Sequence, residues 1–337
     1  MLRAFDSKKI IVIGVVVLIL SVIQTEAFAG KAPTTSKILF TSVRDGNYEV
    51  YIMNTDGSHQ VNLTQNRADD FQAVWAPTGE QILFVSDRDG GTHDLYLMNP
   101  DGSDIRRVFK RKRRINRSNP SWAPDGKQIA YSVRDWNCSR SIIYIATLGK
   151  EKEMEFVMDA TDPAWSPDGS GIACSIEERL TFVNLRTRAR KQFLPKKAIQ
   201  WQRHSSWSAT SHQLVFSGNN HAVPVDRQQR NEWMDKNTIF IINRNGTGLR
   251  QLVDEAGPYA WSPELSPDGR EVLYTQGING AHQILKINVH SGRRTRLTDN
   301  IWNFGGDWFD PEYALPVAPQ PYLLTTTWVA AKTQPSN

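Results

Sequence analysis

Cysteine, long apolar stretches and catalytic signatures are scarce in this chain of 337 residues. The two cysteines, Cys138 and Cys174, form no C-x-x-C or cysteine-histidine spacing, which argues against a zinc site. The sequence has no G-x-S-x-G nucleophile elbow, no H-E-x-x-H and no glycine-rich phosphate loop, so three common enzyme signatures are missing. The longest predominantly apolar run, Ile10 to Ile23, covers 14 residues, fewer than the about 20 that a helix needs to span a bilayer.

This run lies within an N-terminal segment that has the pattern of an export signal. Arg3, Lys8 and Lys9 precede the apolar run, and an A-x-A cleavage pattern at residues 27–29 follows it. We therefore expect a signal peptide over residues 1–29 and a mature protein that starts at Gly30, in the periplasm or secreted. An uncleaved anchor is the alternative. No cysteine stands at the cleavage point, which argues against a bacterial lipid anchor. In such a compartment the two cysteines either pair or remain unpaired thiols.

The rest of the chain is organised by a repeat. A five-residue segment that begins with tryptophan and reads Trp-Ser-Pro-Asp-Gly in its clearest copy recurs every 42 to 58 residues. A period in the low forties, with several short strands and a turn in each unit, is typical of propeller blades. The copies, some of them degenerate, are Trp75–Gly79, Trp122–Gly126, Trp165–Gly169, Trp207–Ser211, Leu265–Gly269 and Trp308–Pro311.

The pattern within each unit predicts four antiparallel strands, A to D from the axis outward, with the tryptophan at the end of strand A. The first unit, from Lys37, lacks a tryptophan-led segment before it, and the last such segment lacks strands after it. Joining them closes a sixth blade and removes the exposed edges that an open array would leave. We expect an all-β, six-bladed β-propeller over residues 37–314, after a short linker at 30–36 and before a C-terminal tail at 315–337.

The repeat resembles that of the TolB-type β-propellers. Trp-Ser-Pro-Asp-Gly is followed by an apolar strand, by Asp-Arg-Asp-Gly and by a strand of the Ile-Tyr-x-Met kind, and the resemblance covers roughly residues 37–311. Similar blades occur in the periplasmic Tol–Pal component, in peptidases of the prolyl-oligopeptidase type and in many exported proteins. Because we find neither the α/β domain that precedes the TolB propeller nor the hydrolase domain that follows the peptidase propellers, the resemblance implies a propeller that works as a binding module.

Two recurrent features of the repeat fit structural roles better than binding roles. The tryptophans are expected to pack between blades, although an array for stacking sugars is the alternative. The aspartates of the B–C turns, at positions 45, 87, 89 and 135, are expected to stabilise those turns. A calcium site is the alternative, but each turn offers far fewer than the six to eight oxygens that calcium takes. We expect no cofactor, and a calcium ion in the channel or loops stays a possibility.

The two faces of a propeller differ in what they carry. We call the face with the A–B and C–D turns the turn face, and the face with the B–C loops and blade-to-blade connections the connection face. Binding residues concentrate on loops held by a rigid scaffold, which favours the connection face. Polar residues just ahead of each tryptophan are expected to ring the channel mouth there as a binding site, unless they only line a water-filled channel. They are Gln72, Asn119, Asp162, His204 and Ser262.

Two departures from the repeat also lie on the connection face. A basic run, with Arg106, Arg107 and Arg117 nearby, could meet an anionic polysaccharide or lipid surface, or simply be a solvated loop. No aromatic residue interrupts it, so single-stranded nucleic acid would find no stacking platform. The insertion at residues 218–236 carries Trp233, which suits either a protein-interaction loop or a self-packed lid. The run comprises Lys110, Arg111, Lys112, Arg113 and Arg114.

These observations favour a monomeric, non-enzymatic scaffold that binds a protein partner in the cell envelope and does not bind nucleic acid. The formal net charge of +5 agrees with an anionic partner or surface without requiring one. The alternative is a carbohydrate-active or other small-substrate enzyme, a lyase or hydrolase, at the channel mouth, with His204 and Asp162 as base and acid. A purely structural envelope protein is the third hypothesis.

Overall fold

The computed structural model describes residues 30–316, apart from short internal stretches at 112–114, 136–139, 151, 196–197, 211, 227–228, 256 and 300. The predicted signal peptide and most of the tail lie outside the described residues. Within the described part of the chain, no helix is long and apolar enough to cross a membrane.

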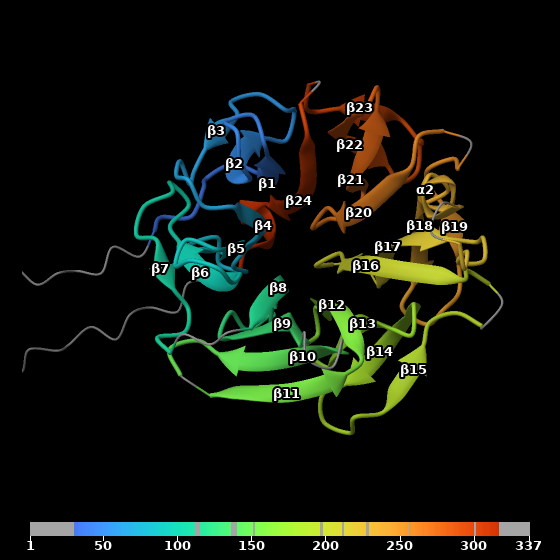
Figure 1. The fold of residues 1–337 in the computed structure, drawn as a ribbon, viewed down its shortest axis with the longest axis horizontal. Helices are drawn as coiled ribbons and strands as arrows, with labels where there is room; N and C mark the ends of the chain where they lie inside the picture. Colours follow the sequence, from blue (N-terminus) through green and yellow to red (C-terminus); the bar gives the residue numbers. More distant parts are fainter. Residues whose placement is uncertain are drawn as a thin grey trace, which may run out of the picture.

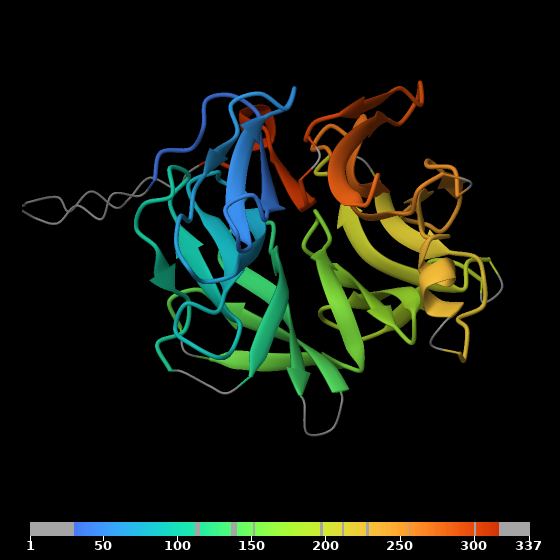
Figure 2. The ribbon, with the colours of Figure 1, turned by 45° about the horizontal axis from the view of Figure 1, so that its top comes forward.

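The described chain forms six four-stranded antiparallel sheets arranged as blades around a central axis (Figures 1 and 2), which confirms the predicted propeller. From the axis outward, blade 1 consists of β4 (Asp70–Trp75), β5 (Ile82–Ser86), β6 (Asp94–Met98) and β7 (Arg106–Arg107). Blade 2 consists of β8 (Asn116–Trp122), β9 (Gln128–Asp135), β10 (Arg140–Thr147) and β11 (Glu153–Met158). Blade 3 consists of β12 (Ala160–Trp165), β13 (Gly171–Ile176), β14 (Arg179–Asn184) and β15 (Arg190–Gln192).

In the same order, blade 4 consists of β16 (Trp201–Trp207), β17 (Gln213–Asn219), β18 (Thr238–Asn243) and β19 (Arg250–Gln251). Blade 5 consists of β20 (Ala260–Leu265), β21 (Glu271–Ile278), β22 (Ala281–Asn288) and β23 (Arg294–Arg296). Blade 6 consists of β24 (Asn303–Phe309), β1 (Lys37–Ser42), β2 (Glu49–Asn54) and β3 (Val61–Asn62).

Blade 6 is the closing blade, and it joins the two ends of the propeller. Strand β24 pairs antiparallel with β1, so that Ile38 lies opposite Trp308 and Lys37 opposite Phe309. Figure 1 shows this pairing at the point where the ends of the coloured chain meet. The prediction that one blade takes strands from both ends of the repeat array is confirmed.

Hydrophobic pattern explains which strands lie where. The second strand of each blade is apolar on both faces, as in β5, which is buried along its whole length, because neighbouring blades cover both sides of it. In five blades the outermost strand is only two or three residues long, and β15 and β23 are exposed throughout, whereas β11 has six residues and buries Phe156 and Val157. Short, charged outer strands leave little unpaired edge for aggregation.

The tryptophans at the ends of the inner strands pack between blades, as predicted. Trp75, Trp122 and Trp165 are buried, and the ring of Trp75 lies 5.2 Å from that of Phe309 on the closing blade. The indole of Trp207 donates a hydrogen bond to the carbonyl of Ala164 in the preceding blade, at 3.2 Å.

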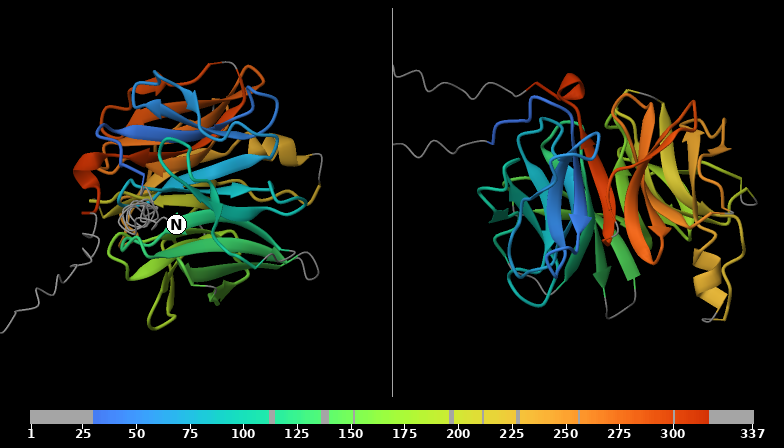
Figure 3. Two further views of the ribbon diagram at one scale, coloured as in Figure 1. Left: turned by 90° about the vertical axis from the view of Figure 1, so that its left-hand side faces the viewer. Right: turned by 90° about the horizontal axis from the view of Figure 1, so that it is seen from above.

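Two short helices mark the opposite faces, as Figure 3 shows. Helix η1 (Pro311–Tyr313) follows β24 on the turn face, and the amide of Leu315 donates to the carbonyl of Pro77 at 2.9 Å. Helix α2 (Gln229–Met234) belongs to the insertion between β17 and β18 on the connection face. The start of the tail therefore packs on the turn face beside the axis.

Equivalent turn glycines allow a matched test of blade packing. Gly79 and Gly126 both follow a Trp-Ala-Pro segment, with φ values of 73° and 66°. A Cβ on Gly79 would lie 2.2 Å from Cζ of Phe309, whereas a Cβ on Gly126 would meet nothing within 4 Å. Both alanine variants carry the strain of a left-handed residue, about 1 kcal/mol. Gly79→Ala must also displace a buried ring, so we expect it to lose a further 1–3 kcal/mol or so of unfolding free energy in urea titrations. Equal losses would contradict the packing described.

Candidate functional site

The five predicted mouth residues share one backbone feature. Each inner strand contains a β-bulge, and at each bulge one residue adopts a left-handed conformation. Such residues are rare outside glycine and persist where the surrounding structure holds them. The residues are Gln72, Asn119, Asp162, His204, Ser262 and, in the closing blade, Gly305, with φ between 50° and 67°.

Side chains of the mouth residues connect four of the six blades. The amide of Gln72 donates to Oδ1 of Asn119 at 2.8 Å, and Nδ2 of Asn119 donates to Oδ1 of Asp162. Nε2 of His204 lies 3.9 Å from Oδ1 of Asp162. Ser262 stands apart, since its backbone amide donates to Oγ of Ser217 at 3.0 Å. The structure thus brings four of the five predicted residues into one polar chain.

Asp162 is well supplied with partners. Besides Asn119, it accepts a hydrogen bond from the hydroxyl of Thr161 at 3.0 Å, and a guanidinium nitrogen of Arg203 lies 3.8 Å away. Arg203 also forms a two-pronged ion pair with Glu178, both N–O distances being 2.8 Å. This side of the mouth is therefore charged and internally compensated.

The other side of the mouth is aromatic. Neighbouring rings there have centroids 5.3 to 6.4 Å apart, and we call the set the aromatic arc. Tyr48 is 37% exposed, and Trp302, which packs on His282 beside the arc, is 47% exposed. The arc was not predicted, although an aromatic residue precedes the bulge residue in three inner strands. Its members are Trp201, His204, Trp261, Phe304, Tyr48 and Phe71.

The insertion extends the arc. Trp233 of α2 is half-buried and meets Trp201 edge to face, with centroids 5.6 Å apart. Its indole donates to the carbonyl of His221 at 2.9 Å, and Asn219 donates to the carbonyl of Trp233 at 2.6 Å. The sequence allowed either a self-packed lid or a protein-interaction loop, and these contacts are those of a self-packed segment. That Trp233 also contacts a protein partner stays a prediction.

The basic run lies only partly within the described residues. Lys110 and Arg111 are exposed, whereas Lys112, Arg113 and Arg114 lie outside the described residues. Of the three flanking arginines, Arg117 was wrongly counted with the run. Arg117 is fully buried between Asp94 and Glu153, at N–O distances of 2.9 and 2.6 Å, because its guanidinium lies on the ring of Phe109 inside the blade packing. Arg106 and Arg107 also pair with aspartates in their own blade.

Two of the B–C turn aspartates, Asp45 and Asp89, accept hydrogen bonds from side chains of their own blades. Asp45 accepts hydrogen bonds from the hydroxyl of Tyr51 and from Asn62, and Asp89 accepts one from the hydroxyl of Tyr96 at 2.6 Å. Burial, together with the hydrogen bond to Asp45, raises the pKa of Tyr51 to about 12. No group of three or more His, Cys, Asp or Glu side chains placed to hold a metal occurs among the described residues. Cys174 is buried in β13, and Cys138 lies outside the described residues.

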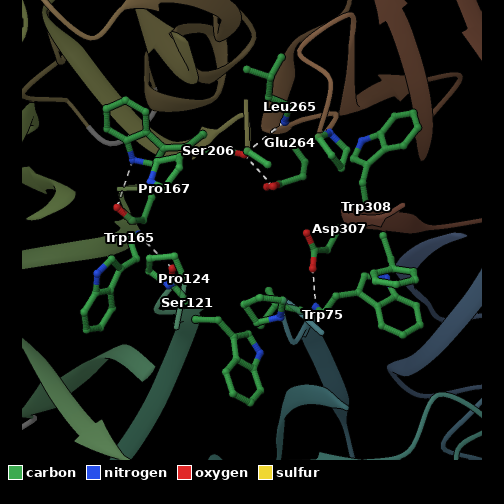
Figure 4. A pocket seen from close by; sticks show the side chains of 18 of the residues that line it. Trp75, Ser121, Pro124, Trp165, Pro167, Ser206, Glu264, Leu265, Asp307 and Trp308 are labelled. Atoms are coloured by element: carbon green, nitrogen blue, oxygen red, sulfur yellow. Dashed lines mark hydrogen bonds between the residues drawn. The ribbon is translucent and has the colours of Figure 1, made fainter. Parts of the chain in front are cut away.

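A cavity that the sequence did not predict opens on the turn face. It has a volume of about 400 Å³, and residues from all six inner strands line it around the axis (Figure 4). We call it the funnel. Its wall includes five tryptophans at the strand ends and four prolines of the turns that follow them. No lysine, arginine or histidine belongs to the described wall, but two carboxylates, of Glu264 and Asp307, point toward its centre.

The carboxylates occupy the position just before the tryptophan or its equivalent. In three blades the side chain at this position accepts a hydrogen bond from the next blade's backbone. Oγ of Ser121 accepts from the amide of Trp165 at 3.0 Å, and the carboxylate of Asp307 accepts from the amide of Trp75 at 2.5 Å. Oγ of Ser206 accepts from the amide of Leu265 at 3.2 Å and donates to Oε1 of Glu264 at 2.6 Å.

Burial makes this pair costly to ionise. It raises the pKa of Asp307 to about 7, against a weaker lowering by backbone hydrogen bonds. It also raises the pKa of Glu264 well above its usual range, and the nearby charge of Asp307 adds to that rise. The funnel therefore holds two acids of which ionising one makes it harder to ionise the other.

This predicts a pH-dependent stability. The folded pKa of Asp307 exceeds its ordinary value of 3.8, so the folded state binds more protons between that value and about 7, and stability falls as pH rises through this window. Asp307→Asn keeps an acceptor for the Trp75 amide and removes the charge. We expect it to be more stable than the wild type by roughly 1 kcal/mol or more at pH 8, and equal at pH 4, in thermal and urea unfolding.

The control is Glu312→Gln, an exposed acid in η1 on the same face, which should leave the pH profile unchanged. An Asp307→Asn profile that parallels the wild type would contradict the raised pKa.

Comparison with known proteins agrees with the propeller fold described above. Residues 22–137 match the model described as the TolB beta propeller domain. The Tol-Pal system protein TolB of Desulfosudis oleivorans is 31% identical over 98 residues, which are 29% of this chain and 22% of that protein. The chain spans only 12% to 37% of four curated relatives that it matches.

Solved structures share the fold. The crystal structure of TolB from Acinetobacter baumannii superposes with a TM-score of 0.67 at 16% identity, over 81% of this chain and 66% of that one. An oligogalacturonate lyase in complex with manganese superposes with a TM-score of 0.53 at 14% identity, over 80% of this chain and 76% of that one. At such identities the likeness concerns the fold alone.

Proposed function

Because this chain is a TolB-like β-propeller, we propose that it is an exported, non-enzymatic scaffold that binds a protein partner in the cell envelope. The signal pattern of residues 1–29 supports export. Two relatives are named as Tol-Pal system proteins, which supports the view that the partner is a protein. The partner docks on the connection face.

The aromatic arc is the observation that carries this proposal. Tryptophan and tyrosine dominate the binding energy of protein interfaces, where they act as anchors surrounded by polar groups. Here Tyr48 and Trp302 present 37% and 47% of their surface to solvent, and the compensated charges of Arg203 and Glu178 lie on the other side of the mouth. Strands on several blades hold the arc, so a partner would meet a preformed surface and pay little ordering entropy.

The test is crosslinked capture of the tagged mature protein from envelope fractions of its own cells. We expect one dominant protein partner, and we expect Trp302→Ala with Tyr48→Ala to lower its recovery at least about tenfold, the effect of truncating hot-spot aromatics. Val61→Ala with Met154→Ala is the matched control, because both side chains are exposed but lie on the outer strands β3 and β11. Recovery of no protein, or equal losses in both pairs, would reject the scaffold.

An enzyme at the channel mouth is the second candidate. Nδ1 of His204 is buried and lacks a hydrogen-bond partner in the described structure, and Asp162 lies within 3.9 Å of its other nitrogen. A histidine with one ring nitrogen near a carboxylate is an arrangement from which an acid–base pair could work.

His204→Ala and Asp162→Ala distinguish the two candidates. As a scaffold, the protein should lose at most partner capture in these variants, and more of it in His204→Ala than in Asp162→Ala, because His204 belongs to the aromatic arc. It should also release no product from a polygalacturonate substrate, measured by absorbance of unsaturated sugars. Turnover by the wild type that both folded variants lose would establish the enzyme instead.

A further inference from the structure

The funnel contains more negative charge than the packing of its blades requires. Ser121 and Ser206 accept the next blade's amide with a hydroxyl, so a serine satisfies this position. Asp307 makes the same bond with one carboxylate oxygen. Asp307 also accepts from the backbone amide of Trp308, and one oxygen of Glu264 accepts its hydrogen bond from Ser206. A serine could make the bonds between blades at both positions, so the two negative charges exceed what these bonds require.

These carboxylates lack a compensating cation within the described wall of the funnel. Two acids placed together in a concave, largely apolar wall repel each other and lose hydration, so the arrangement opposes folding unless something is gained from it. Asp310, the third acid of the wall, caps η1 by accepting from the amide of Glu312 at 3.0 Å. Glu264 and Asp307 have no comparable reason to be acidic.

The wall around them suits an organic cation better than a metal ion. Calcium takes six to eight oxygen ligands, and an indole-rich wall supplies few. Tryptophan faces attract ammonium and guanidinium groups, most strongly where water is excluded. A volume of about 400 Å³ accommodates the head and stem of a lysine or arginine side chain, with room for adjoining backbone.

We propose that the funnel binds a basic polypeptide segment, holding one lysine or arginine side chain between Glu264 and Asp307 and against the tryptophan wall. The occupant is a segment of another protein that enters from the turn face. This inference concerns the face opposite the aromatic arc and does not depend on the scaffold role of the connection face.

A cation between the carboxylates favours their ionised forms. Binding therefore releases protons where the free pair is partly protonated, and affinity increases as pH rises from 5 to 8. High salt weakens the interaction, although less than it would weaken a fully exposed ion pair.

The test is calorimetric titration of the mature protein with blocked pentapeptides Gly-Gly-X-Gly-Gly, in which X is arginine, lysine or citrulline. Citrulline has nearly the shape of arginine without its charge. We expect the arginine and lysine peptides to bind and the citrulline peptide to bind at least tenfold more weakly. Agmatine, which carries the guanidinium without a backbone, should bind more weakly than the arginine peptide. Equal affinity for arginine and citrulline, or preference for agmatine, would overturn the proposal.

Variants locate the contact. Glu264→Gln and Asp307→Asn should each weaken the arginine peptide at least tenfold and reduce the pH dependence, because one acid with a raised pKa remains. Glu312→Gln and Trp302→Ala should change its affinity less than twofold. Asp307→Ser, which keeps an acceptor of the kind present at Ser121, should behave like Asp307→Asn. Unchanged binding in the funnel variants would overturn the proposal, as would millimolar calcium displacing the peptide.

Failure of the proposed peptide binding in the funnel can be distinguished from failure of the proposed scaffold role. Trp302→Ala affects only partner capture, and Asp307→Asn affects only peptide binding, if both proposals hold. Thermal unfolding of each variant confirms that it is folded before binding is measured.

Discussion

The bulge in the inner strand is the constraint on which both faces of this propeller depend. In five blades a residue other than glycine is held left-handed, and only the closing blade uses a glycine, Gly305. The bulge interrupts the pairing of the inner strand with the next strand, so it re-aims the side chains beside it. The polar chain from Gln72 to His204 is a direct consequence. Because the strain recurs in every blade, the packing between blades must hold it, and the channel mouth is accordingly rigid.

Two residues farther along each inner strand, the same geometry produces the funnel. The position before the tryptophan faces the axis and reaches the amide of the following blade. A hydroxyl there stabilises the contact, as at Ser121, and a carboxylate does so while adding charge, as at Asp307. The funnel is therefore a product of small substitutions at one repeated position. The blade framework stays the same, and the chemistry at the axis changes.

Much of the fold was predictable from the sequence, because each blade has recognisable signals within its own short stretch of chain. The tryptophan-led turns, the apolar second strands and the incomplete units at both ends were enough to predict six blades and their closure. The mouth residues were also found by position alone. The funnel was missed because Glu264 and Asp307 are 43 residues apart and look like ordinary surface acids until two blades meet. Arg117 was misassigned for the same reason, since Asp94 and Glu153 reach it only through the packing of neighbouring strands.

The two proposed sites differ in what positions them, and this decides how each would respond to change. The funnel acids belong to paired strands, so a ligand there finds its groups already placed, and its affinity is governed by charge, protonation and fit. The aromatic arc combines strand residues such as Phe304 with the loop residue Tyr48, which packs against Phe71 and Phe304, so its binding would depend on ring contact more than on protonation. Since the inner strands of four blades contribute to the arc and those of all six line the funnel, a propeller of this kind can present charge on one face and an aromatic surface on the other.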